Sequence, residues 1–120
     1  MIEKNWGRII NISSYAALHG YPGDTAYSSA KAGLLGFTMA LAKEVASKGI
    51  TVNVIVPGFI PTDMTAALFN TQEKIEQELQ RIPMRRPGKP EEISDMVNFL
   101  VLKGDYITGT VIRIDGGLGI

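Results

Sequence analysis

The sequence predicts an α/β protein built on a parallel sheet of about three strands covered by helices. Three short runs rich in Ile and Val alternate with segments that carry helix-forming residues and helix end signals. The order strand, helix, strand, helices, strand is typical of parallel sheets, because parallel neighbours need a crossover connection. With 120 residues, 45% hydrophobic and 20% charged, the chain can form one modest domain, and a two-domain enzyme is excluded.

The three runs of β-branched residues are expected to form the strands. They cover residues 8–12, 50–56 and 110–114, and Ile and Val dominate the second, as in strands buried on both faces of a sheet. Turn-forming residues follow each run: Ser13-Ser14, Pro57-Gly58 and Asp115-Gly116-Gly117. Three strands are few for such a sheet, so we expect the strand at 8–12 to have an open edge if the chain stands alone.

The longest helix is expected at residues 25–48, where helix formers fill the segment and Gly49 supplies a C-terminal stop. Apolar residues recur there every three or four positions, so we expect this helix to be mostly buried. They are Leu34, Phe37, Leu41 and Val45. A row of small residues would let a neighbouring element approach closely: Ala30, Gly33 and Gly36.

Two further helices are expected before the last strand. Ile75 and Leu79 indicate a weaker helix at about 71–81. A stronger helix begins at Pro90 and ends at Gly104, because proline suits the first helical position and the carboxylates that follow it favour the positive helix end.

Composition excludes several classes of function. Twelve Lys and Arg balance twelve Asp and Glu, so there is no net field to attract nucleic acid or an anionic membrane. The absence of Cys and the presence of one histidine, His19, argue against a metal site. There is no apolar run of the ~18 residues that a membrane span needs and no signal peptide. We therefore expect a cytoplasmic protein that binds neither nucleic acid nor membrane.

Three side chains are expected to meet at the carboxyl end of the sheet. Tyr27 and Lys31 lie four positions apart near the start of the long helix, which places them on one face. Ser14 follows the first strand, and ligands of parallel sheets bind beyond the carboxyl ends of the strands. A cation close to a phenol favours the phenolate and lowers its pKa, and a serine hydroxyl can hydrogen-bond a substrate oxygen.

This grouping suits a carbonyl substrate and a hydride carried by a nicotinamide. The alternative is purely structural: a tyrosine packed on the sheet beside a lysine whose ammonium reaches solvent. The spacing of Tyr27 and Lys31 is common by chance on helices, so the pair alone leaves both interpretations open.

Four longer stretches of the chain resemble the short-chain dehydrogenase/reductase family, and most closely its 3-oxoacyl-[acyl-carrier-protein] reductases. Together they span nearly all of the chain in the family's order. They are GRIINISS (7–14), AYSSAKAG (26–33), TVNVIVPGFIPTDM (51–64) and YITGTVIRIDGG (106–117).

The resemblance implies a role for each site residue. Ser14 would be the catalytic serine and, with Tyr27, would contact the substrate. Tyr27 would be the general acid in reduction. Lys31 would lower the pKa of the tyrosine and hydrogen-bond the nicotinamide ribose. The residues that would bind the cofactor are Tyr27, Lys31, Pro57, Gly58, Ile60 and Thr62.

The resemblance also implies a function. It points to NAD(P)H-dependent reduction of a 3-oxoacyl group to 3-hydroxyacyl on acyl carrier protein, in fatty acid biosynthesis, with NADP(H) favoured over NAD(H). The alternatives are a catalytically silent fragment and a dehydrogenase of the same family that acts on sugar, steroid or acyl-CoA substrates. The segment from about Met64 to Arg86 resembles the family's mobile substrate flap, and family members are commonly homo-oligomers.

The resemblance finally implies the domain organisation. Residues 1–120 would be the C-terminal catalytic part of a single Rossmann-like, doubly wound domain. The N-terminal dinucleotide-binding half, with its glycine-rich turn, is expected to be absent from this chain. Gly116 and Gly117 cannot replace that turn, because no helix follows them.

Overall fold

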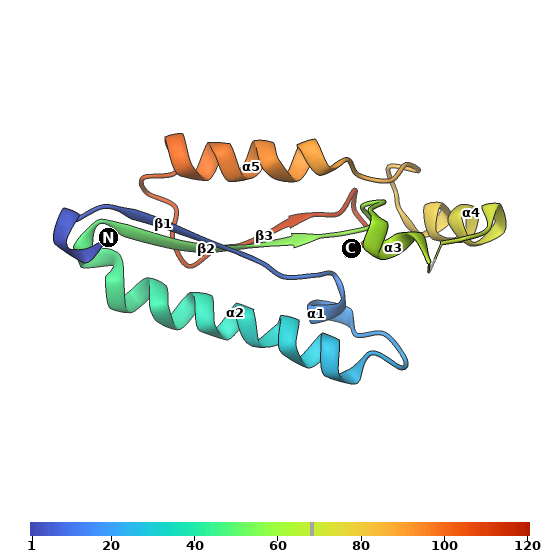
Figure 1. Ribbon diagram of the computed structural model, residues 1–120, viewed down its shortest axis with the longest axis horizontal. Coiled ribbons are helices and arrows are strands. Elements are labelled where there is room, and N and C mark those ends of the chain that lie inside the picture. Colours follow the sequence, from blue (N-terminus) through green and yellow to red (C-terminus); the bar gives the residue numbers. More distant parts are fainter. Residues whose placement is uncertain (68) are drawn as a thin grey trace.

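The computed structural model describes residues 1–67 and 69–120 and contains a three-stranded parallel sheet with helices on both faces (Figure 1). Strands β1 (Gly7–Ile12), β2 (Ile50–Pro57) and β3 (Val111–Ile114) lie side by side in that order. The register pairs Gly7 with Ile50 and Val54 with Val111. The predicted fold class and all three predicted strands are therefore confirmed.

Helix α2 (Thr25–Val45) lies along one face of the sheet and α5 (Pro90–Lys103) along the other, while three shorter helices lie beyond the carboxyl ends of the strands (Figure 1). The shorter helices are α1 (Ala16–His19), α3 (Asp63–Ala66) and α4 (Gln72–Arg81). Single 3₁₀ turns occupy Ile2–Lys4 and Ala46–Lys48. The three predicted helices are confirmed; α1 and α3 are too short to leave a periodic signal in the sequence.

The helix ends follow from local chemistry. Thr71 caps α4 by accepting a hydrogen bond from the backbone N–H of Lys74 at 3.3 Å. The longest helical segment of the chain, α2 with the 3₁₀ turn that follows it, ends at Gly49. Gly49 has a φ of 67°, and a Cβ at this position would lie 2.2 Å from the carbonyl oxygen of Asn5. Only glycine fits there, and this close approach begins the pairing of β1 with β2.

The two crossover connections have opposite handedness. Both move in the same direction across the sheet, from β1 to β2 and from β2 to β3, yet α2 and α5 lie on opposite faces (Figure 1). One of them is therefore of the uncommon left-handed type. The long connection from β2 to β3, which contains α3 and α4, gives the chain enough length to reach the second face.

Strand β2 forms the centre of the core. All of its residues from Ile50 to Val56 are buried, since helices cover both faces and a strand lies on either side. One apolar cluster joins β2 to α2 through Val52 and Ala42. A second cluster lies beyond the strand ends and consists of Phe59, Ile82 and Leu118.

The expectation that the long helix is mostly buried is wrong. Only Thr38 and Ala42 of α2 are buried, and Phe37 is 52% exposed. The reason is geometric: a sheet of three strands offers one narrow face to a helix, so the rest of the helix surface faces outward. A Cβ placed on Gly33 or Gly36 would meet nothing within 4 Å.

The edge of β1 is open, as expected. Among the described residues β1 pairs with β2 alone. The backbone N–H groups of Gly7 and Ser13 point to β2, at 3.3 and 2.8 Å from their acceptors, so those of the alternating residues Arg8, Ile10 and Ile12 point away from it.

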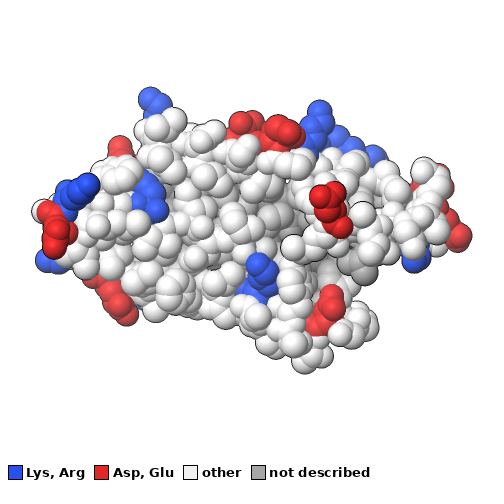
Figure 2. All heavy atoms as spheres, viewed as in Figure 1, with Lys and Arg blue, Asp and Glu red and all other residues white. Residues whose placement is uncertain are grey.

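No described helix is both long and apolar enough to cross a membrane. On the face seen in Figure 2, charged side chains of both signs are mixed toward the ends, and the centre is nearly free of charge.

Candidate active site

Ser14, Tyr27 and Lys31 are all placed near the carboxyl end of β1. Ser14 lies between the end of the strand at Ile12 and the start of α1, while Tyr27 and Lys31 lie in the first turns of α2. Helix α1 packs against α2, so the segment that begins at Ser14 lies along the part of α2 that carries the other two residues. Tyr27 is 42% exposed, which leaves its phenol accessible to a ligand.

Lys31 is held by contacts at both ends of the residue. Its ammonium donates a hydrogen bond to the backbone carbonyl of Ile12 at 3.0 Å, and its own carbonyl accepts one from the Ser13 hydroxyl at 2.7 Å. The ammonium nitrogen lies 5.8 Å from the centroid of the Tyr27 ring. The structure therefore brings the predicted cation and phenol together on one face of α2.

Within the described part of the chain, the Ser14 hydroxyl accepts one hydrogen bond and donates none. Its Oγ accepts a hydrogen bond from the backbone N–H of Ala16 at 3.2 Å. A serine hydroxyl can donate one hydrogen bond and accept two, so the proton remains available for a substrate oxygen.

Sequence reasoning assigned no function to Ser13, which the structure shows as the anchor of the site. Ser13 is 4% exposed, and its hydroxyl fastens the end of β1 to α2 at Lys31. The available signal was the doubled serine at the end of a buried strand, since a hydroxyl buried there needs a hydrogen-bond partner.

The loop after β2 carries the residues expected to bind a cofactor. The carbonyl of Pro57 accepts a hydrogen bond from Tyr15 at 3.0 Å, and the N–H of Gly58 donates to Ile114 at 2.9 Å. A Cβ on Gly58 would lie 2.7 Å from the Cα of Asp115, so β3 requires glycine at this position. Thr62 precedes α3, and its N–H donates to the Thr65 hydroxyl at 2.9 Å. The first two contacts hold the start of the loop against Tyr15, the residue after Ser14, and against the end of β3.

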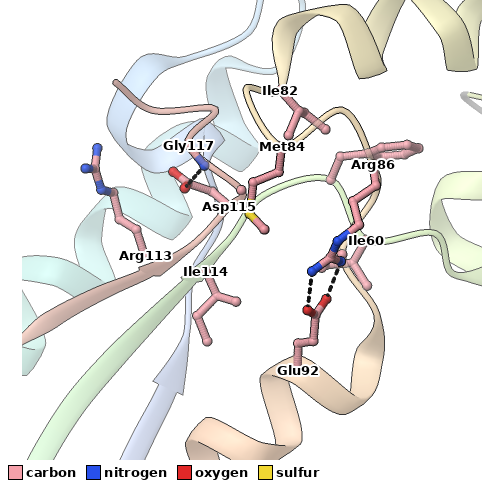
Figure 3. A pocket seen from close by; sticks show the side chains of 12 residues that line it. Ile60, Ile82, Met84, Arg86, Glu92, Arg113, Ile114, Asp115 and Gly117 are labelled. Carbon is pink, nitrogen blue, oxygen red and sulfur yellow. Dashed lines mark hydrogen bonds and ion pairs between the residues drawn. The ribbon is translucent and has the colours of Figure 1, made fainter.

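A cavity of about 340 Å³ lies beside this loop and is lined in part by Ile60 (Figure 3). Its apolar lining comes from the ends of β2 and β3 and from the segment after α4: Phe59, Ile82, Met84 and Ile114. Arg86 and Glu92 form a two-pronged ion pair at its wall, with N···O distances of 2.9 and 2.6 Å. None of the three predicted catalytic residues lines this cavity.

The Arg86 guanidinium, with help from the backbone N–H of Lys89, lowers the pKa of Glu92 to about 2. The pair is thus ionised at neutral pH, and its two charges offset each other at the cavity wall.

The segment expected to act as a flap, residues 64–86, contains most of α3 and all of α4. Leu68, within it, lies outside the described residues. Helix α4 lies at one end of the molecule, beyond the strand ends (Figure 1).

Comparison with known proteins finds a family and close relatives. The profile of the family described as "Enoyl-(Acyl carrier protein) reductase" matches residues 1–119. The 3-oxoacyl-[acyl-carrier-protein] reductase FabG of Aquifex aeolicus is 49% identical over 120 residues, which cover 98% of this chain and 47% of the relative. The protein of the same name from Chlamydia trachomatis is 53% identical over 119 residues, with 98% and 47% covered.

A solved structure is similar over the same region. It is titled "Short-chain dehydrogenase/reductase SDR:Glucose/ribitol dehydrogenase" from Brucella melitensis, and it superposes with a TM-score of 0.87 at 32% identity. The match covers 94% of this chain and 45% of that one. The chain thus spans about half the length of the curated relatives it matches.

Proposed function

Because the chain belongs to the short-chain dehydrogenase/reductase family, we propose that it carries the catalytic part of a nicotinamide-dependent oxidoreductase. The proposed reaction is reduction of a 3-oxoacyl group, linked to acyl carrier protein, to the 3-hydroxyacyl product. The observation that carries the proposal is the position of the Lys31 ammonium, bonded to the Ile12 carbonyl and close to the exposed Tyr27 ring.

The choice of a keto group over a carbon–carbon double bond has two supports. The family profile is named for enoyl reduction, whereas relatives about 50% identical over nearly the whole chain are named 3-oxoacyl reductases. The proposed site would supply two proton donors, the Ser14 hydroxyl and the Tyr27 phenol, and a carbonyl oxygen that gains charge during reduction is stabilised by such donors.

In this reaction each side chain has a distinct task. Ser14 donates a hydrogen bond to the carbonyl oxygen, which its contact with Ala16 leaves it free to do. Tyr27 gives its phenolic proton to the same oxygen as charge develops there. Lys31, anchored through Ser13 and Ile12, keeps a positive charge beside the phenol and stabilises the phenolate that remains. A bound nicotinamide supplies the hydride to the carbonyl carbon.

The donor set fits the nicotinamide half of such a cofactor. Lys31 and Tyr27 offer an ammonium and a phenol to ribose hydroxyls. The loop with Pro57, Gly58, Ile60 and Thr62, held at Pro57 and Gly58 by backbone hydrogen bonds, would lie along the nicotinamide ring. The preference for NADP(H) over NAD(H) stays a prediction, as does a cytoplasmic location.

We further propose that the active enzyme includes a second, N-terminal half that binds dinucleotide phosphates and packs on the edge of β1. The accessible surface is 7571 Å², whereas about 6,300 Å² is expected for a compact monomer of this length. The surplus is comparable to one side of a stable interface. The unpaired backbone of β1 would then join a larger sheet.

The experiment combines this chain with the N-terminal half of the Aquifex relative in one cell and follows oxidation of NADPH by an acetoacetyl group on acyl carrier protein. The Tyr27→Phe variant should lose at least about a hundredfold in rate, as expected for removal of a general acid. Tyr106→Phe, a change to a fully exposed tyrosine outside the site, is the matched control and should keep full activity. Equal rates for wild type and Tyr27→Phe would refute the assignment.

A further inference from the structure

Two side chains of helix α4, Leu79 and Arg81, contact parts of the chain near the candidate active site. On its apolar side, Leu79 packs against the cluster of Phe59, Ile82 and Leu118. Tyr15, the residue after Ser14, packs against the same cluster. The end of α4 therefore lies close to the loop that leads from Ser14 to Tyr27.

Arg81, the last residue of α4, makes a second connection to that loop. Its guanidinium carbon lies 5.8 Å from the centroid of the Tyr21 ring. Its Nη1 is 2.8 Å from an oxygen of Glu78, a side chain that is only 10% exposed. One guanidinium thus joins a nearly buried carboxylate of α4 to an aromatic ring of the loop.

The aromatic contacts continue from Tyr21 toward the catalytic serine. The rings of Tyr21 and Tyr15 are 5.9 Å apart and tilted by 55°, and Tyr15 stacks on His19 at 4.3 Å. The peptide N–H of Tyr15 is in turn bonded to Pro57 at 3.0 Å. A continuous row of contacts therefore runs from Arg81 to the backbone beside Ser14.

The electrostatics of the two groups agree with this proximity. Burial raises the pKa of Tyr21, and the neighbouring Arg81 guanidinium acts in the opposite direction. The neighbouring Tyr21 phenol is in turn the main cause that raises the pKa of Arg81. Glu78 and Tyr15 are the other titratable groups that act on the Tyr21 phenol.

We propose that Arg81 is a positioning residue that fastens α4, through Tyr21, to the loop between Ser14 and Tyr27 and so holds this helix beside the candidate active site. The inference rests on the proposed function for its effect on substrate binding. The contact itself, and its effect on α4, belong to this chain alone and can be measured without any activity.

The first test is hydrogen exchange of the 120-residue chain, read separately for α4 and for α2. Arg81→Gln should speed exchange in α4 by about three- to tenfold, the range expected for one cation–aromatic contact with a hydrogen bond. Exchange in α2 should not change. Lys74→Gln is the matched control, since it removes the same charge from the same helix but breaks only an exposed bond to Asn70.

A spectroscopic signature distinguishes this contact from a general loss of helix stability. Tyrosine ionisation is followed by ultraviolet absorbance, and Tyr21→Phe identifies the contribution of that residue. Because Arg81 lowers the pKa of Tyr21, Arg81→Gln should raise it further, while Lys74→Gln should leave it unchanged. An unchanged Tyr21 titration in Arg81→Gln, or equal acceleration of exchange in α2 and α4, overturns the inference.

The third measurement uses the active two-part assembly. Arg81→Gln should raise KM for the carrier-linked substrate about threefold or more and change kcat less, because a less firmly held α4 weakens substrate binding more than the chemical step. Faster α4 exchange with an unchanged KM would overturn the role of Arg81 at the active site. Failure of the proposed function would appear elsewhere, as a Tyr27→Phe variant with full activity.

Discussion

Asn53 shows how one polar residue fixes the start of a strand. It lies at the centre of β2 with no exposed surface, and its side chain donates to the Ile107 carbonyl at 2.7 Å and accepts from the Thr110 N–H at 3.1 Å. A buried amide is tolerated only when it is hydrogen-bonded, so these two bonds hold the loop before β3 against the sheet.

We therefore expect Asn53→Leu to destabilise the chain by about 2–4 kcal/mol, since two partly buried hydrogen bonds to the backbone are lost. Urea unfolding followed by circular dichroism measures the change. Asn98→Leu, at an exposed position of α5, should shift stability by no more than about 0.5 kcal/mol. Equal midpoints for the two variants would contradict the role of Asn53.

Arg85 combines a strained backbone with a compensating side chain. Its φ is 55°, in the left-handed region that favours glycine. Its guanidinium donates to the carbonyl of Gln80 at 2.6 Å, and so satisfies a carbonyl in the last turn of α4. The side chain thus recovers part of the free energy that the backbone conformation costs.

Two substitutions separate these contributions. Arg85→Ala keeps the strain and loses the cap, so thermal unfolding should show a loss of about 1 kcal/mol. Arg85→Gly also loses the cap but relieves the strain, and its stability should lie within about 0.5 kcal/mol of wild type. If both variants unfold at the same temperature, backbone strain makes no contribution at this position.

At the scale of whole elements, the start of α5 is stabilised by one carboxylate. Glu92 accepts hydrogen bonds from Arg86 and from the backbone N–H of Lys89 at 2.8 Å, just before the helix begins. A negative charge in the first turn is favourable because the helix dipole is positive there. The same group joins α5 to the loop that lines the cavity in Figure 3.

The pH dependence of this helix start follows from the lowered pKa. Glu92 has a pKa of about 2 when folded against an ordinary value of 4.5, so the stability it contributes is present above pH 4.5. That stability should be lost as the pH falls from about 4.5 to about 2. Melting temperatures of Glu92→Gln should fall less steeply over this range than those of wild type.

Glu91→Gln is the control for this measurement, because Glu91 is a neighbouring exposed carboxylate on the same helix. Its melting temperatures should follow the wild-type curve. If Glu92→Gln loses stability in acid as steeply as wild type, the ion pair between Arg86 and Glu92 does not cause the pH dependence of stability.

At the scale of the whole molecule, the chain is elongated. Its radius of gyration is 15.8 Å, compared with about 13.6 Å for a compact domain of this length. Helix α2 carries exposed apolar side chains, among them Phe37, which is 52% exposed. We propose that a second copy of the chain covers the side of α2 that carries Phe37, as expected for a homo-oligomer.

Sedimentation velocity tests this proposal. Phe37→Glu should weaken self-association at least about tenfold, because a charge would be buried among apolar groups. Met84→Glu, at a similarly exposed apolar residue away from α2, should leave association unchanged. A wild-type chain that stays monomeric at millimolar concentration would refute the proposal.

The sequence by itself determined the strands, the three longer helices and the candidates for catalysis. Short runs rich in Ile and Val, the end signals at Gly49 and Pro90, and the four-residue spacing of Tyr27 and Lys31 are all local patterns. Such patterns are legible because secondary structure and helix faces depend on residues close together in the chain.

Only the tertiary structure decided how these parts combine. Two of these features join residues 18 or more positions apart: the anchoring of Lys31 by Ser13 and Ile12, and the contact of Arg81 with Tyr21. The exposure of α2 depends on the width of the sheet. The opposite handedness of the two crossovers is likewise invisible in the sequence. All of these features depend on how elements distant in the sequence pack together. Steric fit and buried area act between such elements, not along a single segment of the chain.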